Sequence, residues 1–591
     1  MRRRALVTLL ATALPFAAAS PTFGQESLLD RYSPVTDALL ATPADGDWLS
    51  FRRTAAGWGY SPLDQINRDN VGDLNLVWAR GMEAGNQEGT PLVHDGVMFL
   101  PNAAGVIQAL DATNGDLLWE YRRQYPENLA DFDGLAGVTR TVALYENLVI
   151  TTTSDGFIVA LDIASGQVVY EIETANYETQ STRQSGGPII ANGKIISGRR
   201  CSARGGPAAC FVAAHDATNG EELWRFYTIP QPGEPGFDTW GDTPYESRRH
   251  LGTWMVPTFD PDLNLVYFGT STTAPYSKFH LNDPLVRDWE YLYQSSTLAI
   301  DADTGELVWY VQHLRDHWDL DNVFTRMIVD TVVSPDPAEV DWINPNLVPG
   351  ETRQVITGIP GKLGLIYTID RATGEFLWAR DTVYQNVVVG MQDTGLAVTN
   401  PDILFTELNQ EYLVCAGIYG GLDWQAGTYS PRTNAMYYPL QNACSMQNNI
   451  IENPTAADGA AMRHRTVVAP DAQNIGTVFA VSAETGRTLW THDERAGVWS
   501  MFSTGGGLVF GGDLNRRFRA FNDETGEVLW ETILGAPMAG YPMTYAVDGR
   551  QYVAVPVGAA GVTGRNIIGL TPELRPGASG NYLFVFALPG D

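Results

Sequence analysis

Seven near-copies of one eleven-residue segment constrain the fold of this chain more than any other feature. Each copy approximates small–apolar–Asp–x–x–Thr–Gly–x–x–apolar–Trp, and the copies occupy 109–119, 160–170, 214–224, 299–309, 368–378, 480–490 and 520–530. The polar centre predicts a tight turn, and the alternating apolar residues on either side predict two strands. A hairpin cannot bury its own faces, so such units must stack, with the terminal Trp wedged against the next unit. The repeats therefore predict an all-β fold, a β-propeller.

The spacing of the copies sets the expected number of blades. The longest gap, between 378 and 490, contains the segment 429–437, which reads as strand–turn–strand without the terminal Trp. Counting this segment as a degenerate eighth unit predicts an eight-bladed β-propeller. A last strand over 582–588 is expected to pair with a strand near 74–78, which would close the ring and remove its free edges.

The N-terminal residues 1–24 have the pattern of a signal peptide. Arg2, Arg3 and Arg4 precede an apolar run over 5–19, which is short for a membrane span. We therefore expect residues 25–591 to form a single propeller domain that is exported to the periplasm without membrane insertion.

The formal net charge of −30 restricts the partners of the protein. So negative a chain is repelled by nucleic acid and by anionic membranes, which argues against both as partners. The charge is compatible with bound cations or a basic redox protein, and equally with an acidic surface that only keeps the protein in solution.

Four cysteines, at positions 201, 210, 415 and 444, predict two disulfides in an oxidising compartment. The count alone allows three pairings, of which 201–210 with 415–444 closes the shortest loops. The sequence has no Cys-x-x-Cys-His motif, so covalent c-type haem is not expected.

Two long insertions, 228–254 and 310–360, are expected to gather over the ring axis, where loops on a rigid scaffold carry function. The second contains Trp318-Asp319-Leu320-Asp321. Two carboxylates at this spacing could bind a hard cation, or one could act as a general base. A solvated turn or a pair of acids on a strand is the alternative.

These repeats and loops together resemble the pyrroloquinoline quinone (PQQ)-dependent alcohol dehydrogenases, the quinoprotein family that includes methanol dehydrogenase. The resemblance covers essentially the whole chain after residue 24. The segments that carry it are QEGTP at 87–91, FDPDLNLVYFGT at 259–270, HWD at 317–319, GKLGLIYTIDR at 361–371 and GGLDW at 420–424.

The resemblance implies that PQQ lies in an axial funnel of the ring. Trp254 matches the tryptophan on which the cofactor ring stacks, as a flat tricyclic quinone requires. Lys362 matches a cation that hydrogen-bonds the quinone oxygens and stabilises charge as the quinone is reduced. The other matching cofactor contacts are Glu88, Arg140, Ser185, Asp423, Trp424 and Trp499. Cys415 and Cys444 match a disulfide of the family by position.

The resemblance also implies the chemistry. Asp319 aligns with the catalytic base, which removes the hydroxyl proton of an alcohol while hydride passes to C5 of PQQ. A metal ion polarises the C5 carbonyl as a Lewis acid. Asp321 matches a position that is acidic in lanthanide-dependent members.

The metal ligands of the family are only partly present. A ligand Asn falls on Thr272, and a ligand Glu has no counterpart in a loop that instead holds Arg199, Arg200 and Arg204. The expected ion is therefore Ca²⁺ or a lanthanide, held by Asp319, Asp321, Thr272 and oxygens of PQQ.

We therefore expect a haem-free, periplasmic dehydrogenase that oxidises a primary or secondary alcohol and passes electrons to an external acceptor such as a cytochrome c. A PQQ-dependent sugar or polymer dehydrogenase is one alternative. A non-catalytic propeller that scaffolds envelope proteins is another. A group of aromatic residues in one loop could suit a bulky alcohol or could simply pack the insertion: Phe237, Trp240, Tyr245, Tyr276 and Phe279.

Overall fold

The computed structural model describes residues 28–132, 138–202, 204–281, 289–453, 455, 462–577 and 580–590. The expected signal peptide at 1–24 lies outside these ranges, and the single-domain boundary stays a prediction. No helix within these ranges is long and apolar enough to cross a membrane.

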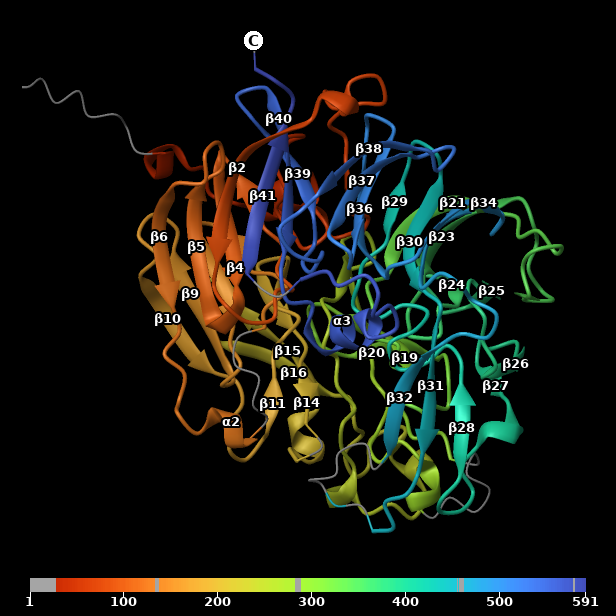
Figure 1. Ribbon diagram of the computed structural model, residues 1–591. Helices are drawn as coiled ribbons and strands as arrows, with labels where there is room; N and C mark the ends of the chain where they lie inside the picture. Colours follow the sequence, from red (N-terminus) through yellow and green to blue (C-terminus); the bar gives the residue numbers. More distant parts are fainter. Residues whose placement is uncertain are drawn as a thin grey trace, which may run out of the picture.

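Sheets of four or five strands, antiparallel in all but one pair of strands, make up the ring (Figure 1). Eight such sheets occur among the described residues, which equals the number of blades that the repeats predict. In chain order within each sheet, the strands are β3 (Leu92–His94), β4 (Val97–Asn102), β5 (Val106–Asp111) and β6 (Leu117–Arg122); β7 (Ala143–Tyr145), β8 (Leu148–Thr152), β9 (Phe157–Asp162) and β10 (Val168–Glu173); β12 (Ile189–Ala191), β13 (Lys194–Ser197), β15 (Phe211–Asp216) and β16 (Glu222–Tyr227); β17 (Thr258–Asp260), β18 (Leu265–Gly269), β19 (Ser296–Asp301) and β20 (Leu307–Gln312); β21 (Met327–Val333), β22 (Trp342–Ile343), β23 (Glu351–Gly358), β24 (Ile366–Asp370) and β25 (Phe376–Arg380); β29 (Thr428–Ser430), β30 (Ala435–Gln441), β33 (Gly476–Ser482) and β34 (Thr488–Glu494); β1 (Tyr60–Ser61), β35 (Val498–Thr504), β36 (Leu508–Asp513), β37 (Arg517–Asn522) and β38 (Val528–Ile533); and β2 (Asn75–Met82), β39 (Met543–Val547), β40 (Arg550–Val557) and β41 (Asn581–Ala587).

Each repeat forms a hairpin of two adjacent strands, as predicted. In the first repeat, β5 and β6 flank a turn in which Asp111 Oδ1 accepts hydrogen bonds from the N–H and the Oγ1–H of Thr113, at 2.8 and 2.6 Å. Gly115 has a φ of +80°, a conformation that glycine adopts without the strain of a side chain.

The terminal aromatic residue of a repeat docks on the turn of the next sheet. Trp119 Nε1 donates to the carbonyl oxygen of Ile163 at 2.8 Å, and Trp490 Nε1 donates to that of Asp523 at 3.0 Å. A Cβ built on Gly166, in the turn that receives Trp119, would lie 2.5 Å from the Trp119 ring. The repeated glycine therefore leaves room for the neighbouring tryptophan, which confirms the predicted wedge.

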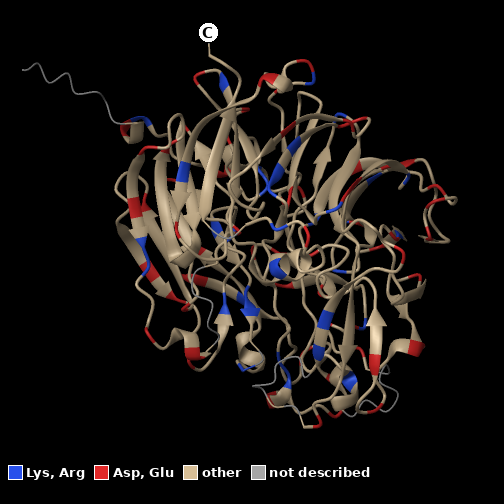
Figure 2. Ribbon diagram, viewed as in Figure 1, with Lys and Arg blue, Asp and Glu red and all other residues tan. Residues whose placement is uncertain are grey.

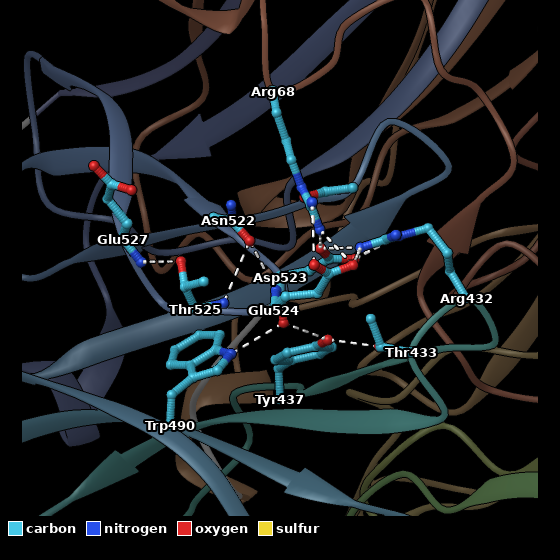
Figure 3. Close-up of polar contacts among 11 residues, drawn as sticks. Arg68, Arg432, Thr433, Tyr437, Trp490, Asn522, Asp523, Glu524, Thr525 and Glu527 are labelled. Atoms are coloured by element: carbon cyan, nitrogen blue, oxygen red, sulfur yellow. Dashed lines mark hydrogen bonds and ion pairs between the residues drawn. The ribbon is translucent and has the colours of Figure 1, made fainter.

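The turn that receives Trp490 also joins distant parts of the chain (Figure 3). The fully buried carboxylate of Asp523 pairs with both Arg68 and Arg432. Tyr437 donates its hydroxyl to the same carbonyl as Trp490, at 2.9 Å. The two ion pairs of Asp523 thus link the N-terminal segment, through Arg68, to the blades that contain Arg432 and Asp523.

Apolar side chains are buried between neighbouring sheets. One cluster joins the β17–β20 sheet to the β21–β25 sheet through Leu265, Trp309, Ile328 and Ile356. This part of the core thus lies between two neighbouring blades.

The predicted identity of the eighth unit is wrong. The segment 429–437 forms parts of β29 and β30, which pair with the sixth repeat, β33 and β34, in one sheet. Insertions between these pairs of strands hide the link in the sequence.

The eighth sheet is the one that closes the ring. It pairs β2 with β41, as predicted for the two ends of the chain, and Figure 1 shows these two strands side by side. Trp78 of β2 docks on Gly115 as the repeat tryptophans do on their glycines.

The insertions add smaller elements. In Figure 1 the strands β11, β14, β28, β31 and β32 lie toward the bottom of the view, and α3 lies near the centre. The added strands are β11 (Thr182–Arg183), β14 (Arg200–Cys201), β26 (Val388–Met391), β27 (Ala397–Thr399), β28 (Glu411–Val414), β31 (Ala443–Asn448) and β32 (Arg463–Val468). The helices are α1 (Asp37–Ala41), α2 (Leu129–Phe132) and α3 (Gly561–Ile568), with 3-10 turns η1 (Leu28–Arg31), η2 (Val71–Asp73), η3 (Ala103–Gly105), η4 (Pro207–Ala209), η5 (Phe237–Trp240), η6 (Tyr245–Ser247), η7 (Lys278–Leu281) and η8 (Pro401–Ile403). Disulfides join Cys201 to Cys210 and Cys415 to Cys444, which confirms the expected pairing.

Candidate active site

A cavity of about 290 Å³ collects most of the expected site residues. Its lining includes Glu88, Arg140, Ser185, Trp254, Asp319, Asp321, Lys362, Asp423 and Trp424. Most of them lie in connections that lead into the first strand of a sheet, such as Glu88 before β3 and Trp254 before β17. The propeller therefore brings residues from across the sequence to one place.

Trp254 is fixed by polar contacts on both its backbone and its ring. Its carbonyl oxygen accepts hydrogen bonds from Arg140 Nη1 at 3.2 Å and Ser185 Oγ at 3.3 Å. Its Nε1–H donates to Asp321 Oδ2 at 3.1 Å, and Phe324 packs edge-on against the ring at 5.7 Å. The indole is thus held in one orientation at the cavity wall, as stacking of a flat cofactor requires.

Arg140 and Glu88 form a buried ion pair beside Trp254. Burial raises the pKa of Glu88, although the charge of Arg140 opposes this rise. Arg140 also lies 5.3 Å from the centroid of the Trp254 ring and 5.7 Å from that of Trp424. Its guanidinium is therefore placed to meet the carboxylates of a planar anion.

Lys362 lies between the two expected acids. Its Nζ is 3.0 Å from Asp319 Oδ1 and 3.1 Å from Asp321 Oδ2. Burial raises the pKa of Asp319, and the charge of Asp321 adds to this effect while Lys362 opposes it. Burial alone would lower the pKa of Lys362, but the two carboxylates raise it well above its ordinary value. The lysine is therefore an ammonium ion that holds both acids.

The carboxylate of Asp316 holds the loop around Asp319 in its conformation. Asp316 Oδ1 and Oδ2 accept the backbone N–H groups of Trp318 and Leu320, at 2.8 and 2.6 Å. Asp319 itself has a φ of +69°, a region that non-glycine residues rarely adopt. Such strain often marks functional positions, because the surrounding contacts must enforce it.

The groups around Asp321 suit a hard cation in part. Asp321 Oδ1 accepts the backbone N–H of Thr272 at 2.9 Å, and the buried Oγ1 of Thr272 has no hydrogen-bond partner among the residues that the structure describes. Burial opposes ionisation of Asp321, but Lys362 and the Thr272 N–H outweigh it and lower the pKa. The described residues contain no cluster of three or more His, Cys, Asp or Glu side chains suited to a metal. Among the described residues, this place thus offers two carboxylates and a neighbouring hydroxyl as side-chain oxygen ligands.

Asp423 lines the cavity beside Thr563 of α3. Thr563 of α3 donates a hydrogen bond to Asp423 at 2.5 Å, yet burial raises the pKa of Asp423 to about 6. Trp424 lines the cavity. Trp499 is not among the lining residues: it packs edge-on behind Trp424 at 5.0 Å, and its Nε1 donates to the Ala539 carbonyl.

Of the five loop aromatics, Tyr276 alone lines the cavity. Trp240 is fully buried and donates to the Leu292 carbonyl at 2.6 Å, and Arg248 covers the Phe237 ring at 4.0 Å. The insertion therefore uses most of its aromatic residues for its own packing.

The cavity also contains residues that the sequence did not single out as site residues. They are Asn86, Val138, Ser154, Arg183, Arg200, His250, Ile418, Tyr419, Val562, Thr563 and Arg565. His250 could have been expected near the cavity, because it lies only four residues before Trp254 in the sequence. Thr563 and Arg565 lie on α3, more than 300 residues beyond Trp254, and no sequence pattern marks them.

Known proteins are similar to this chain in sequence and in fold. The family model described as PQQ, "Glucose/ethanol/alcohol dehydrogenase, beta-propeller domain", matches residues 48–401 and 495–553. The dehydrogenase subunit of an alcohol dehydrogenase (quinone) from Komagataeibacter europaeus is 32% identical over 553 residues, covering 88% of this chain and 72% of the relative. The quinohemoprotein alcohol dehydrogenase from Comamonas testosteroni is 30% identical over 609 residues, covering 98% and 82%.

Solved structures agree with these sequence matches. Quinohemoprotein alcohol dehydrogenase ADHIIG from Pseudomonas putida HK5 superposes with a TM-score of 0.82 at 29% identity, covering 95% of this chain and 83% of that one. A europium-containing methanol dehydrogenase has the same fold, with a TM-score of 0.82 at 24% identity and coverage of 94% and 100%. The chain therefore belongs to the family of PQQ-dependent alcohol dehydrogenases, enzymes built on a β-propeller.

Proposed function

We propose that this alcohol dehydrogenase works in the periplasm, where it oxidises a primary or secondary alcohol to an aldehyde or ketone. Two disulfides suit an oxidising compartment. A relative from Thauera butanivorans, 28% identical, is named 1-butanol dehydrogenase (cytochrome c). Since this sequence has no Cys-x-x-Cys-His motif, we propose that electrons leave to a separate protein such as a cytochrome c.

We propose that PQQ stacks on Trp254 and is held by Glu88, Arg140, Ser185, Asp423 and Trp424. The fixed indole and the neighbouring guanidinium support this assignment, because they offer an aromatic face and carboxylate-binding donors in one cavity. Bound PQQ supplies a two-electron acceptor for the alcohol carbon.

The observation that carries the catalytic assignment is the contact of Asp319 with Lys362 at 3.0 Å in the cavity that Trp254 lines. We propose that the ionised form of Asp319 accepts the hydroxyl proton of the alcohol, and that Lys362 hydrogen-bonds this carboxylate and opposes the rise of its pKa. Only 15% of the Asp319 side chain is exposed, so the base is shielded from bulk water yet reachable from the cavity.

We propose that Asp319, Asp321 and the Oγ1 of Thr272 hold Ca²⁺ or a lanthanide. The unpartnered Thr272 hydroxyl beside the Asp321 carboxylate supports this set, because hard cations take oxygen ligands. An ion bound there would compete with Lys362 for the same two carboxylates.

The test is reconstitution of the purified protein with PQQ and either Ca²⁺ or La³⁺. Turnover of short-chain, cyclic and aromatic alcohols would be followed with an artificial electron acceptor, and glucose would test the alternative of a sugar dehydrogenase. We expect turnover of alcohols that depends on both PQQ and a metal ion. No alcohol turnover under any combination would contradict the proposal.

A further inference from the structure

The chain has a buried lysine that the proposed reaction does not use. Only three of the 38 basic residues are lysine, at positions 194, 278 and 362, and Figure 2 shows basic segments scattered among acidic ones. Lys194 pairs with Asp303 outside the cavity lining, and Lys362 belongs to the site already described. Lys278, at the start of η7, is fully buried. Burial of an ammonium ion is costly unless hydrogen bonds compensate it, so its contacts indicate its role.

The ammonium group of Lys278 gathers the backbone of the loop over 270–276. Its Nζ donates hydrogen bonds to the carbonyl oxygens of Thr273, Pro275 and Tyr276, at 3.1, 3.3 and 3.2 Å. Three carbonyls that converge on one nitrogen require a compact donor, which an ammonium ion is and a planar guanidinium is not. This requirement accounts for a lysine in a chain that uses arginine for almost all its positive charges.

The same loop carries two groups of the site. Tyr276 lines the cavity. The backbone N–H of Thr272 donates to Asp321 Oδ1 at 2.9 Å. In the other direction, Asn322 N–H donates to the Thr270 carbonyl at 3.2 Å. Through these bonds the loop holds the carboxylate of Asp321, a proposed metal ligand.

Charge connects Lys278 to a second loop of the site, 316–322. Burial raises the pKa of Asp316, and the charge of Lys278 opposes this rise. Asp316 in turn accepts the backbone N–H groups of Trp318 and Leu320, which flank the proposed base in the sequence. The ammonium ion therefore lies near both loops that carry the proposed reacting groups.

We propose that Lys278 is a positioning residue, which fixes the loop over 270–276 and, through the Thr272 N–H, the orientation of the Asp321 carboxylate. This inference rests on the proposed function. Lys278 does not line the cavity, so it acts through the loop rather than by contact with a ligand. Packing alone does not explain it, because a methionine would fill a similar volume without the cost of burying a charge.

Hydrogen exchange of the cofactor-free protein tests the coupling of the two loops. We expect Lys278→Met to raise exchange at least about tenfold in peptides that cover 270–276 and also in those that cover 316–322. Lys278→Arg should do the same, because a guanidinium cannot donate to all three carbonyls from one atom. Lys194→Met is the matched control and should change neither segment. Faster exchange in 270–276 alone, or in neither segment, would contradict the proposal.

Binding of Tb³⁺ to the PQQ-loaded protein, followed by Tb³⁺ luminescence, tests the effect on the proposed metal site. Lys278→Met should raise the Kd for Tb³⁺ by about 10- to 100-fold, the usual effect of losing a group that orients a metal ligand. Trp309→Ala, destabilised between two blades, should keep the Kd of the unchanged protein, which separates a loss of position from a loss of stability. An unchanged Kd in Lys278→Met would overturn the proposal. If the unchanged protein neither binds Tb³⁺ nor oxidises an alcohol, the proposed function fails, while hydrogen exchange still decides the role of Lys278.

If no variant at position 278 folds, the unchanged protein provides the test. Because the chain has only three lysines, carbon-13 labelling of lysine Cε gives three NMR signals, which Lys194→Met and Lys362→Met assign. Addition of La³⁺ to the PQQ-loaded protein should shift the signals of Lys278 and Lys362 and leave that of Lys194 in place. A Lys278 signal that stays in place while that of Lys362 moves would show that the loop is not coupled to the site.

Discussion

Aspartate has opposite roles in the repeats and in the cavity. In the third repeat, Asp216 Oδ1 accepts the N–H and the Oγ1–H of Thr218 at 2.8 and 2.5 Å, and these hydrogen bonds lower its pKa. In the cavity, burial raises the pKa of Asp423 to about 6, although Lys362 and Thr563 oppose this rise. The hydrogen bonds of the turn stabilise the ionised carboxylate of Asp216, whereas burial in the cavity favours the protonated forms of Asp319 and Asp423, as is common for catalytic groups.

Tryptophan shows the same division. Trp309 is 9% exposed in the core between two sheets and donates its Nε1–H to a backbone carbonyl. Trp254 instead presents part of its ring to the cavity and donates its Nε1–H to Asp321, a proposed metal ligand. Tryptophans of the repeats, such as Trp309, thus stabilise the fold, whereas Trp254, which lies outside the repeats, is available to a ligand.

The largest effect is expected from removing the proposed base. Asp319→Asn should lower kcat by about 10²- to 10⁴-fold, because an amide cannot accept the hydroxyl proton. Asp216→Asn, the matched change in a repeat turn, should leave kcat within twofold. Steady-state rates with an artificial acceptor measure both, and metal analysis of the same samples separates loss of the base from loss of the ion. An Asp319→Asn enzyme with normal kcat would mean that the base lies elsewhere.

Removing one tryptophan of each kind should separate binding from folding. Trp309→Ala should lower the free energy of unfolding by about 3–5 kcal/mol, since it empties a packed site between blades. Trp254→Ala should weaken PQQ binding at least tenfold with a smaller loss of stability. Urea denaturation and PQQ titration measure the two quantities. Equal loss of PQQ affinity in both variants would contradict the distinction.

A smaller effect should distinguish two glycines with similar backbones. Gly526 and Gly549 have φ values of +74° and +78°, but only Gly526 faces a tryptophan, with a built Cβ 2.5 Å from Trp490. Gly549→Ala should cost about 1–2 kcal/mol through left-handed strain alone. Gly526→Ala should cost about 2–4 kcal/mol, because Trp490 must also move. Equal costs in urea denaturation would show that the docked tryptophan adapts freely.

Local patterns in the sequence predicted the parts of the fold that depend on near neighbours. The turn around Asp111 and Gly115 and the docking of Trp119 follow from one eleven-residue motif. The pairing of β30 with β33 was missed, because 34 residues with strands of their own separate Gln441 from Gly476. The resulting error assigned the eighth unit to the wrong segment.

The candidate site shows the same limit. The residues named from the resemblance to the family lie around one cavity, except that Trp499 and Thr272 lie outside its lining. Arg183, Arg565 and Thr563 were missed, since their place in the cavity lining depends on which distant loops the ring brings together. Arg200 was noticed only as a replacement for an expected metal ligand, and its partner across the ladder is visible only in three dimensions.

The smallest effect concerns pH and has opposite signs in the two regions. Because the folded pKa of Asp423 is about 6, above the ordinary value of 3.8, folded protein holds this proton more tightly than unfolded protein, and the stability that this group contributes falls as pH rises from about 4 to 6. Asp423→Asn lacks this loss, so the cofactor-free variant should gain about 1–3 kcal/mol of stability relative to the unchanged protein between pH 4 and pH 7.

Asp216 has a lowered pKa, so its contribution to stability is present above pH 3.8 and is lost on acidification. Asp216→Asn should therefore be less stable than the unchanged protein from pH 7 down to about pH 4, with the deficit shrinking only below pH 3.8. Urea midpoints at four pH values test both variants. If the two variants shift in the same direction relative to the unchanged protein, the buried and the hydrogen-bonded aspartates do not differ in the way proposed.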